Sequence, residues 1–143
     1  MPKVSGQKFK MTQVWKGDEV IPGTVIKVIK KEGDPEIAFK EGDLVMVTGH
    51  SKGRGFQGGV KRHGFHGGPK THGQKNRLRA PGSIGSTAPQ RVTPGRRMAG
   101  HMGTNQVSIK NLEVVSVAEN GSEILLKGAV PGMRGSNVIL SKT

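Results

Sequence analysis

The chain of 143 residues contains no cysteine and no tyrosine, and only 3% of its residues are aromatic. Without cysteine it has no disulfide framework, no thiolate zinc site and no cysteine nucleophile. No apolar run approaches the roughly 20 residues of a membrane span, and residues 1–5 lack the apolar core of a signal peptide. These absences predict at most one soluble domain, in the reducing environment of the cytoplasm.

Negative charge is also missing from a long part of the sequence. The chain carries 23 lysines and arginines against 10 acidic residues, a net charge of +13, yet residues 44–112 contain no acidic side chain. The basic window, residues 49–105, holds 11 lysines and arginines, all five histidines and 14 of the 23 glycines. A surface that carries only positive charge attracts polyanions. The window therefore predicts a partner that is either nucleic acid or an anionic membrane surface.

Short aliphatic runs of strand length lie on both sides of the window. Turn residues separate them, and no stretch shows a sustained helical period. We predict an all-β fold, a small antiparallel β-barrel of about six short strands, formed by residues 1–48 and 106–143. The expected strands are 24–29, 44–48, 107–109, 112–117, 123–127 and 138–140.

Two local features of these flanks carry further expectations. Asn120 and Gly121 lie between two of the aliphatic runs, and this pair predicts a two-residue hairpin turn of type I′. Phe9 and Trp15 are two of the few aromatic residues in the chain. Because both lie in the part of the sequence assigned to the barrel, we expect them to pack in its core rather than to offer stacking surfaces.

The basic window cannot form a hydrophobic core, because its apolar residues are sparse and follow neither the helical nor the strand period. We predict a long, basic, glycine-rich extension, residues 49–105, that leaves the barrel and returns to it. A loop of this length is usually functional or disordered. We expect it to stay mobile until a polyanion orders it.

RNA fits the composition of the window better than DNA or a membrane. Glycines interrupt every candidate helix, which argues against a membrane-surface helix and against a recognition helix for the DNA major groove. Folded RNA is recognised by shape, phosphate and 2′-hydroxyl contacts. Lysines and arginines would neutralise phosphates, and histidines would make polar or stacking contacts. The predicted RNA-binding residues are Lys52, Arg54, Lys61, Arg62, His63, His66, Lys70, His72, Lys75, Arg77, Arg79, Arg91, Arg96, Arg97 and His101.

Two other motifs in the window predict no chemistry. Residues 53–58 match the G-x-G-x-x-G dinucleotide fingerprint, but no acidic residue follows about 20 residues later. His63, His66 and His72 have no carboxylate or thiolate near them in the sequence to complete a metal site. No spacing of nucleophile, base and orienting residue is visible. We therefore predict no cofactor, no metal site and no enzyme activity.

Seven segments of the sequence carry a specific resemblance. They are GQKFKMTQ at 6–13, TGHSKGRGFQG at 48–58, VKR at 60–62, THG at 71–73, RAPGSIG at 79–85, GRRMAGHMG at 95–103 and KGAVPG at 127–132. In this order, and over nearly the whole chain, they resemble the universal large-subunit ribosomal protein L-three family. The resemblance implies a structural ribosomal protein with a β-barrel body on the outer part of the large subunit.

The resemblance also implies a position and partners. The extension would thread through ribosomal RNA toward the peptidyl transferase centre, and the protein would join early in subunit assembly without catalysing peptide transfer. Its partners would be large-subunit ribosomal RNA and neighbouring ribosomal proteins, with no membrane. The tip of the extension would lie at Pro81, Gly82, Ser83, Ile84, Gly85 and Ser86.

Several alternatives stay open at this point. The segment 29–43 is shorter than the usual stretch of the family, so the barrel is minimal, incomplete, or completed by a neighbouring protein or a second copy of the chain. The alternative functions are a free-standing RNA or DNA chaperone and an engineered minimal barrel that is not incorporated into ribosomes. A ribosomal protein should prefer its folded RNA site over bulk duplex by a large factor, whereas a chaperone should not.

Overall fold

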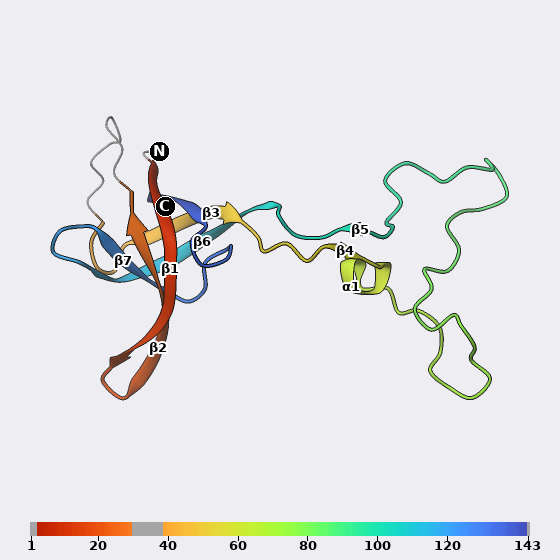
Figure 1. The fold of residues 1–143 in the computed structure, drawn as a ribbon, viewed down its shortest axis with the longest axis horizontal. Coiled ribbons are helices and arrows are strands. Elements are labelled where there is room, and N and C mark those ends of the chain that lie inside the picture. Colours follow the sequence, from red (N-terminus) through yellow and green to blue (C-terminus); the bar gives the residue numbers. More distant parts are fainter. Residues whose placement is uncertain (1–2, 30–38, 143) are drawn as a thin grey trace. The chain divides into compact units, whose positions relative to one another are not determined.

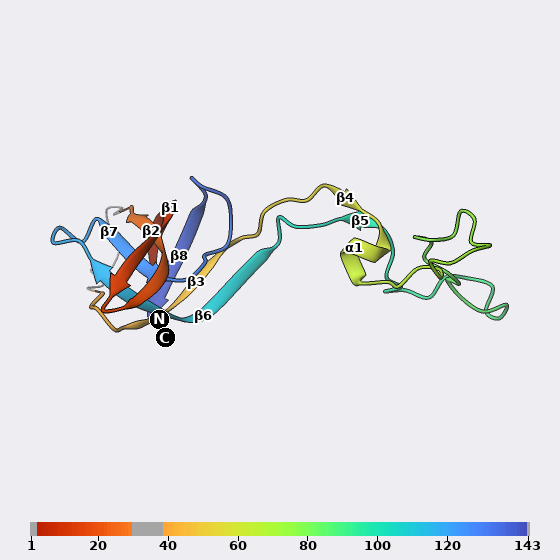
Figure 2. The same ribbon diagram turned by 90° about the horizontal axis from the view of Figure 1, so that it is seen from below.

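The computed structural model describes residues 3–29 and 39–142. Within these residues the chain forms a six-stranded sheet, a short two-stranded sheet and one helix (Figure 1, Figure 2). The elements in chain order are β1 (Lys3–Lys16), β2 (Glu19–Val28), β3 (Leu44–His50), β4 (Phe56–Gln57), α1 (Gly59–His63), β5 (Gly100–His101), β6 (Gln106–Val117), β7 (Glu123–Lys127) and β8 (Asn137–Lys142). The predicted all-β fold is confirmed.

The six-stranded sheet is a closed antiparallel barrel with the strand order β1-β2-β7-β6-β3-β8. β8 closes it by pairing with strands on both sides, since Leu140 lies opposite Val4 of β1 and opposite Val47 of β3. Closure removes the unpaired edges of a sheet. The described strands therefore complete the barrel without a second copy of the chain. Most of the short segment 29–43 lies outside the described residues.

Aliphatic side chains from all six strands fill the barrel interior. Five of them are 0% exposed: Ile26, Val45, Val47, Leu126 and Leu140. Gly6 of β1 makes room for them, because a Cβ atom at this position would lie 2.7 Å from the Cγ2 atom of Ile26. Gly6 thus leaves the space that the Ile26 side chain occupies in this small barrel.

The predicted number of strands is right, but one predicted strand was divided and another was missed. Residues 107–109 and 112–117 belong to the single strand β6, which pairs with β3 from Gln106 to Glu113 through an irregularity in the register. Asn111 has a positive φ of 58° there, and the polar residues Lys110 and Asn111 interrupt the aliphatic pattern, so the sequence predicts two strands where the structure has one. β1 was missed because two of its inward positions hold Gly6 and Lys8 instead of aliphatic residues.

Lys8 is a buried cation, only 8% exposed. Its Nζ atom donates hydrogen bonds to the carbonyl oxygens of Val130 (2.7 Å) and Gly132 (2.9 Å). Burial, and after it the charge of Lys52, lowers the pKa of the Lys8 ammonium. The side chain therefore ties β1 to the loop between β7 and β8.

Two of the local expectations are wrong. β6 and β7 form the predicted hairpin, but their loop spans residues 118–122, and Gly121 has a positive φ (61°) while Asn120 does not. A type I′ turn needs a positive φ at both positions. Trp15 is 66% exposed rather than buried, because the β1–β2 ladder continues beyond the part of β2 that pairs with β7. Phe9 is half-buried and lies outside the core cluster.

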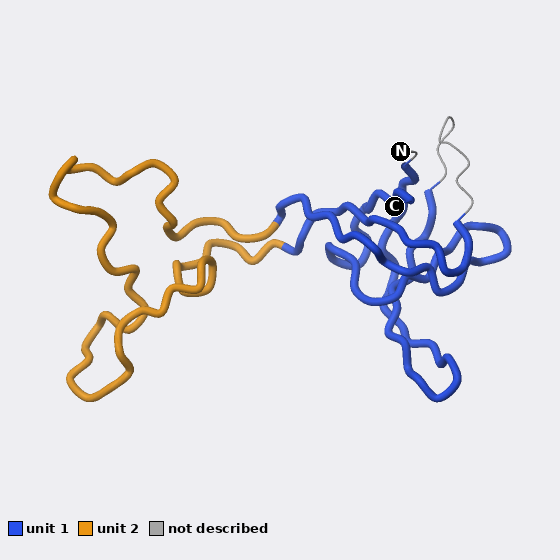
Figure 3. Tube along the Cα trace, turned by 180° about the vertical axis from the view of Figure 1, so that it is seen from behind, with its two compact units in different colours: residues 1–52, 104–143 blue, residues 53–103 orange. Residues whose placement is uncertain are grey.

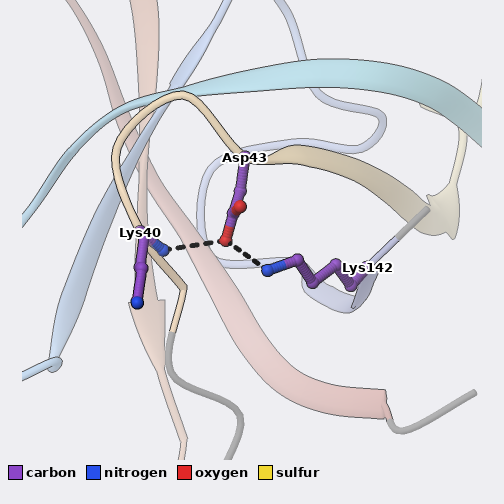
Figure 4. A network of polar contacts seen from close by, with 3 residues as sticks. All are labelled: Lys40, Asp43 and Lys142. Carbon is purple, nitrogen blue, oxygen red and sulfur yellow. Dashed lines mark hydrogen bonds and ion pairs between the residues drawn. The ribbon is translucent and has the colours of Figure 1, made fainter.

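A polar network ends the turn before β3 (Figure 4). The Oδ2 atom of Asp43 accepts hydrogen bonds from the Nζ atom of Lys142 (2.8 Å) and from the backbone N–H of Lys40 (3.0 Å). The bond from Lys142, and next the bond from the Lys40 backbone, lowers the pKa of the Asp43 carboxyl below 3.8. The network links the start of β3 to β8, its neighbour in the barrel.

This lowered pKa predicts how the stability of the barrel depends on pH. The stabilisation by the Asp43 carboxylate is fully present above the ordinary pKa of 3.8 and is lost as the pH falls through the lower folded value. Asp43→Asn should therefore reduce Tm at pH 7 by a small amount, within about 5 °C. The difference should shrink below pH 3.8, as thermal unfolding over a pH series would show. A constant difference at every pH would contradict the ionic role.

The chain divides into two compact units (Figure 3). The barrel unit comprises residues 1–52 and 104–143, and the central unit comprises residues 53–103. Both ends of the basic window belong to the barrel unit, because the β3–β6 ladder reaches His50 and Gln106, and the Ser51 N–H then donates to the Asn105 carbonyl oxygen (2.9 Å).

Candidate nucleic-acid interface

The central unit has no buried residue, and the structure describes all of residues 53–103. It holds ten lysines and arginines and no acidic residue. A unit of this composition cannot gain stability from a hydrophobic core, and its charges repel one another without internal compensation. The local structure of the central unit is held by hydrogen bonds and by a few side-chain contacts.

A short ladder and a helical turn form the first ordered part of the central unit. β4 pairs with β5, and Phe56 lies opposite His101. The rings of these two residues pack edge to face, with their centroids 5.9 Å apart. α1 follows β4 and is capped by Gly64, which has a positive φ (73°). The Gly64 N–H donates to the Val60 carbonyl oxygen (3.1 Å), and the Phe65 N–H donates to the Gly59 carbonyl oxygen (3.4 Å). α1 has five residues and lies between Gly58 and Gly64, so glycines bound this short helix at both ends.

Two predicted binding residues on α1 converge on one backbone oxygen. The Nη1 atom of Arg62 donates to the carbonyl oxygen of Met98 (2.8 Å), and the Nε2 atom of His63 lies 3.0 Å from the same oxygen. Gly100 allows this approach, because a Cβ atom there would lie 2.7 Å from Arg62 Nη1. These contacts join the outgoing and returning segments of the central unit, so Arg62 and His63 position the backbone there.

A backbone crossing closes a basic loop farther along the chain. The Gly68 N–H donates to the Leu78 carbonyl oxygen (3.1 Å). Gly67 lies so close to this oxygen that a Cβ atom would be 2.0 Å from it, and its φ is 75°. Glycine is therefore required at the crossing. The closed loop presents four of the predicted binding residues: Lys70, His72, Lys75 and Arg77.

The predicted tip, residues 81–86, is exposed at every position. Within it the Ser83 hydroxyl donates to the Gly85 carbonyl oxygen (3.0 Å). The Nη2 atom of Arg96 donates to the Ser83 carbonyl oxygen, and this hydrogen bond closes a second loop, residues 83–96. The segment thus carries exposed small and apolar groups next to a positioned arginine.

Most of the predicted binding residues are free to meet a partner. Of the fifteen, Arg62 and His63 are half-buried, and the other thirteen are exposed. Lys52 belongs to the barrel unit, and the rest belong to the central unit. The structure brings Phe56 against His101 and Phe65 near His63, with ring centroids 5.8 Å apart. Phe56 and Phe65 are not among the residues predicted to bind RNA.

The described residues also show which other sites they lack. Across 3–29 and 39–142, His, Asp and Glu side chains form no group of three or more that could hold a metal ion. The helix in this part of the chain is too short and too polar to cross a membrane.

The chain combines a closed β-barrel with a cationic unit that lacks a buried residue, a composition that favours polyanions as partners. The comparison with protein families is more specific. The family model described as Ribosomal protein L3 matches residues 24–127, and the chain belongs to this family. The resemblance to the L-three family is thereby confirmed. Proteins of this family are structural ribosomal proteins, not enzymes.

Individual relatives agree with the family match. The chain is 54% identical over 102 residues to the large ribosomal subunit protein uL3 of Chlorobium limicola, covering 71% of this chain and 49% of that protein. It is 46% identical over 140 residues to the uL3 protein of Chloroherpeton thalassium, covering 94% of this chain and 64% of that protein. The chain thus spans about half to nearly two thirds of the length of these relatives.

Proposed function

We propose that this chain is a structural constituent of the large ribosomal subunit that binds ribosomal RNA. The observation that carries the proposal is the central unit, with ten cationic and no acidic side chains and no buried residue. Such a unit repels itself in isolation and gains its largest stabilisation from a polyanion. The family supplies the polyanion, because the relatives are proteins of the large ribosomal subunit.

The finer parts of the proposal follow the family resemblance. The central unit would reach through ribosomal RNA toward the peptidyl transferase centre with residues 81–86 at its tip. The barrel unit would lie on the outer part of the subunit beside neighbouring ribosomal proteins. The protein would act early in assembly of the cytoplasmic ribosome. The exposed tip and the two hydrogen-bonded loops of the central unit are consistent with this use.

Salt dependence tests the proposed RNA binding. If about eight phosphates are neutralised, the logarithm of the binding constant for protein-free bacterial large-subunit ribosomal RNA should fall against the logarithm of the salt concentration with a slope of about −6. This corresponds to a loss of about 10³-fold or more between 50 and 200 mM salt. Fluorescence anisotropy of labelled protein measures the slope. A slope near zero would overturn the proposal.

Competition separates this function from that of a nucleic-acid chaperone. A ribosomal protein should keep its RNA complex when duplex DNA is added in excess, since specific sites exceed non-specific ones by at least about 10³-fold. A chaperone with a promiscuous basic surface should lose it at near-equal concentrations. Sedimentation of the tagged chain with large subunits from bacterial cells is the second check, because an unincorporated barrel would remain in the free-protein fractions.

A further inference from the structure

We infer that the barrel unit carries a second RNA-binding site, specific for a backbone phosphate and separate from the central unit. The inference rests on the proposed function, because it assumes that ribosomal RNA is the partner. We call the site the aromatic–cation patch, and it consists of Phe9, Lys10, Lys27 and Arg134. These residues come from β1, β2 and the loop between β7 and β8.

Three cations converge on one aromatic ring in this patch. The Nζ atom of Lys27 lies 4.1 Å from the centroid of the Phe9 ring, the Cζ atom of Arg134 lies 5.3 Å from it, and the Nζ atom of Lys10 lies 5.7 Å from it. All three cationic side chains are exposed, whereas the ring is half-buried. The quadrupole of a single ring attracts each cation only weakly at an exposed site.

The convergence leaves a local excess of positive charge. Lys10 and Arg134 are at most about 11 Å apart, since both lie within 6 Å of one centroid. This separation is close to the Debye length at 0.1 M salt, about 10 Å, so the repulsion between them is only partly screened. Glu123 approaches Lys27 at 3.8 Å, but this pair is weak because the two side chains are 45% and 46% exposed. An anion at the patch would relieve the repulsion.

The backbone that carries Arg134 is already held in place. The Gly135 N–H donates to the Lys8 carbonyl oxygen (2.7 Å), and the Gln7 side chain donates to the Gly135 carbonyl oxygen (3.0 Å). The Lys8 ammonium fixes the start of the same loop through Val130 and Gly132. Binding therefore costs little backbone entropy, which is the advantage of a preorganised site.

The geometry favours a phosphate over a stacked base. Lys27 already covers the face of the Phe9 ring at 4.1 Å, so the ring is not open to a nucleobase. Two ammonium groups and a guanidinium beside one ring supply hydrogen-bond donors for the oxygens of a phosphate, which a guanidinium binds bidentately. None of these residues belongs to the basic window, so their charges add a contact on the barrel unit.

Charge-matched variants test the patch. The patch variant carries Lys10→Gln, Lys27→Gln and Arg134→Gln, and the control carries Lys3→Gln, Lys16→Gln and Lys110→Gln, which removes the same net charge from exposed positions of the barrel unit. For protein-free large-subunit ribosomal RNA, the patch variant should bind about tenfold more weakly than the control. Its salt slope should be smaller by about one to two. Thermal unfolding verifies that both variants fold.

The outcomes distinguish the patch from the proposed function. If the wild-type chain binds with a steep salt slope but the patch variant equals the control, the patch inference is overturned and the proposed function stands. If the wild-type chain shows no salt-dependent binding, the proposed function itself is overturned. An acidic protein partner for the patch would give the first of these results.

Directed cleavage gives a test that does not depend on removing charge. The chain has no cysteine, so Met133→Cys creates a unique attachment point for an iron chelate beside Arg134, at a side chain that is 61% exposed. In the RNA complex the generated radicals should cleave the RNA backbone at a few discrete positions. The control Lys16→Cys, near the β1–β2 turn, should give a different pattern or none. Absence of cleavage from position 133 would overturn the patch.

Discussion

Neutralising four exposed cations of the central unit should weaken binding to ribosomal RNA by about 10²–10³-fold at 150 mM salt. Each lysine or arginine that neutralises a phosphate contributes about 0.7–0.9 to the salt slope, so the slope should fall by about three. The four side chains are exposed, and no hydrogen bond of their charged groups is seen in the described structure. The substitutions are Arg54→Gln, Lys61→Gln, Arg79→Gln and Arg91→Gln.

A matched control separates contact from net charge. Four lysines of the barrel unit outside the aromatic–cation patch provide it: Lys3→Gln, Lys16→Gln, Lys110→Gln and Lys127→Gln. The control has the same net charge but should lose only a few-fold in affinity, since long-range attraction is largely screened at this salt concentration. Equal losses in both variants would show that the central unit makes no phosphate contacts of its own. Circular dichroism should show an unchanged barrel in both.

Lys8→Met should destabilise the barrel by about 2–4 kcal/mol, because it removes two hydrogen bonds from a charged donor and leaves two carbonyl oxygens without this partner. Methionine has a similar unbranched shape, so the change in packing is small. The relief of burying an ammonium offsets part of the loss. Urea denaturation followed by tryptophan fluorescence from Trp15 and by circular dichroism measures the free energy of unfolding.

The same change at an exposed lysine of β1 is the control for this stability prediction. Lys16→Met should alter the free energy of unfolding by less than about 0.5 kcal/mol. Hydrogen exchange at the Gly135 amide offers a local readout. This N–H donates to the Lys8 carbonyl oxygen, so its hydrogen should exchange with solvent faster in Lys8→Met than in the wild type. If Lys8→Met were as stable as wild type, the carbonyl oxygens of Val130 and Gly132 would have to be hydrated.

Strands with uninterrupted aliphatic runs were predictable from the sequence alone. β3 and β7 are examples, since 44–48 and 123–127 contain adjacent apolar residues bounded by turns. β1 was not, because it places Gly6 and Lys8 inside the barrel. Gly6 suits its position because the Ile26 side chain lies against it. Lys8 suits its position because its ammonium group meets two carbonyl oxygens that lie more than a hundred residues away in the sequence. Local patterns carry no information about partners so distant.

The candidate site likewise has features that the sequence predicts and features that it does not. The charges of the basic window could be predicted, because a lysine or arginine keeps its charge in any exposed conformation. The bonds of Arg62 and His63 to the Met98 carbonyl oxygen could not, since they join positions 36 and 35 residues apart. The convergence of Lys27 and Arg134 on Phe9 was missed for the same reason, and Phe9 was expected in the core.

The paired exit of β3 and β6 has a consequence for how the chain tolerates its long insertion. Ser51 and Asn105 face each other through a backbone hydrogen bond, and the Thr104 N–H donates to Ser51 in return (3.2 Å). For the barrel, the intervening segment of about fifty residues is therefore a single closed loop that connects β3 to β6. Loop-closure entropy grows only logarithmically, by about 0.6 kcal/mol for each doubling in length. Lengthening or shortening that segment is thermodynamically cheap for the barrel, so its sequence is free to follow the shape of a partner.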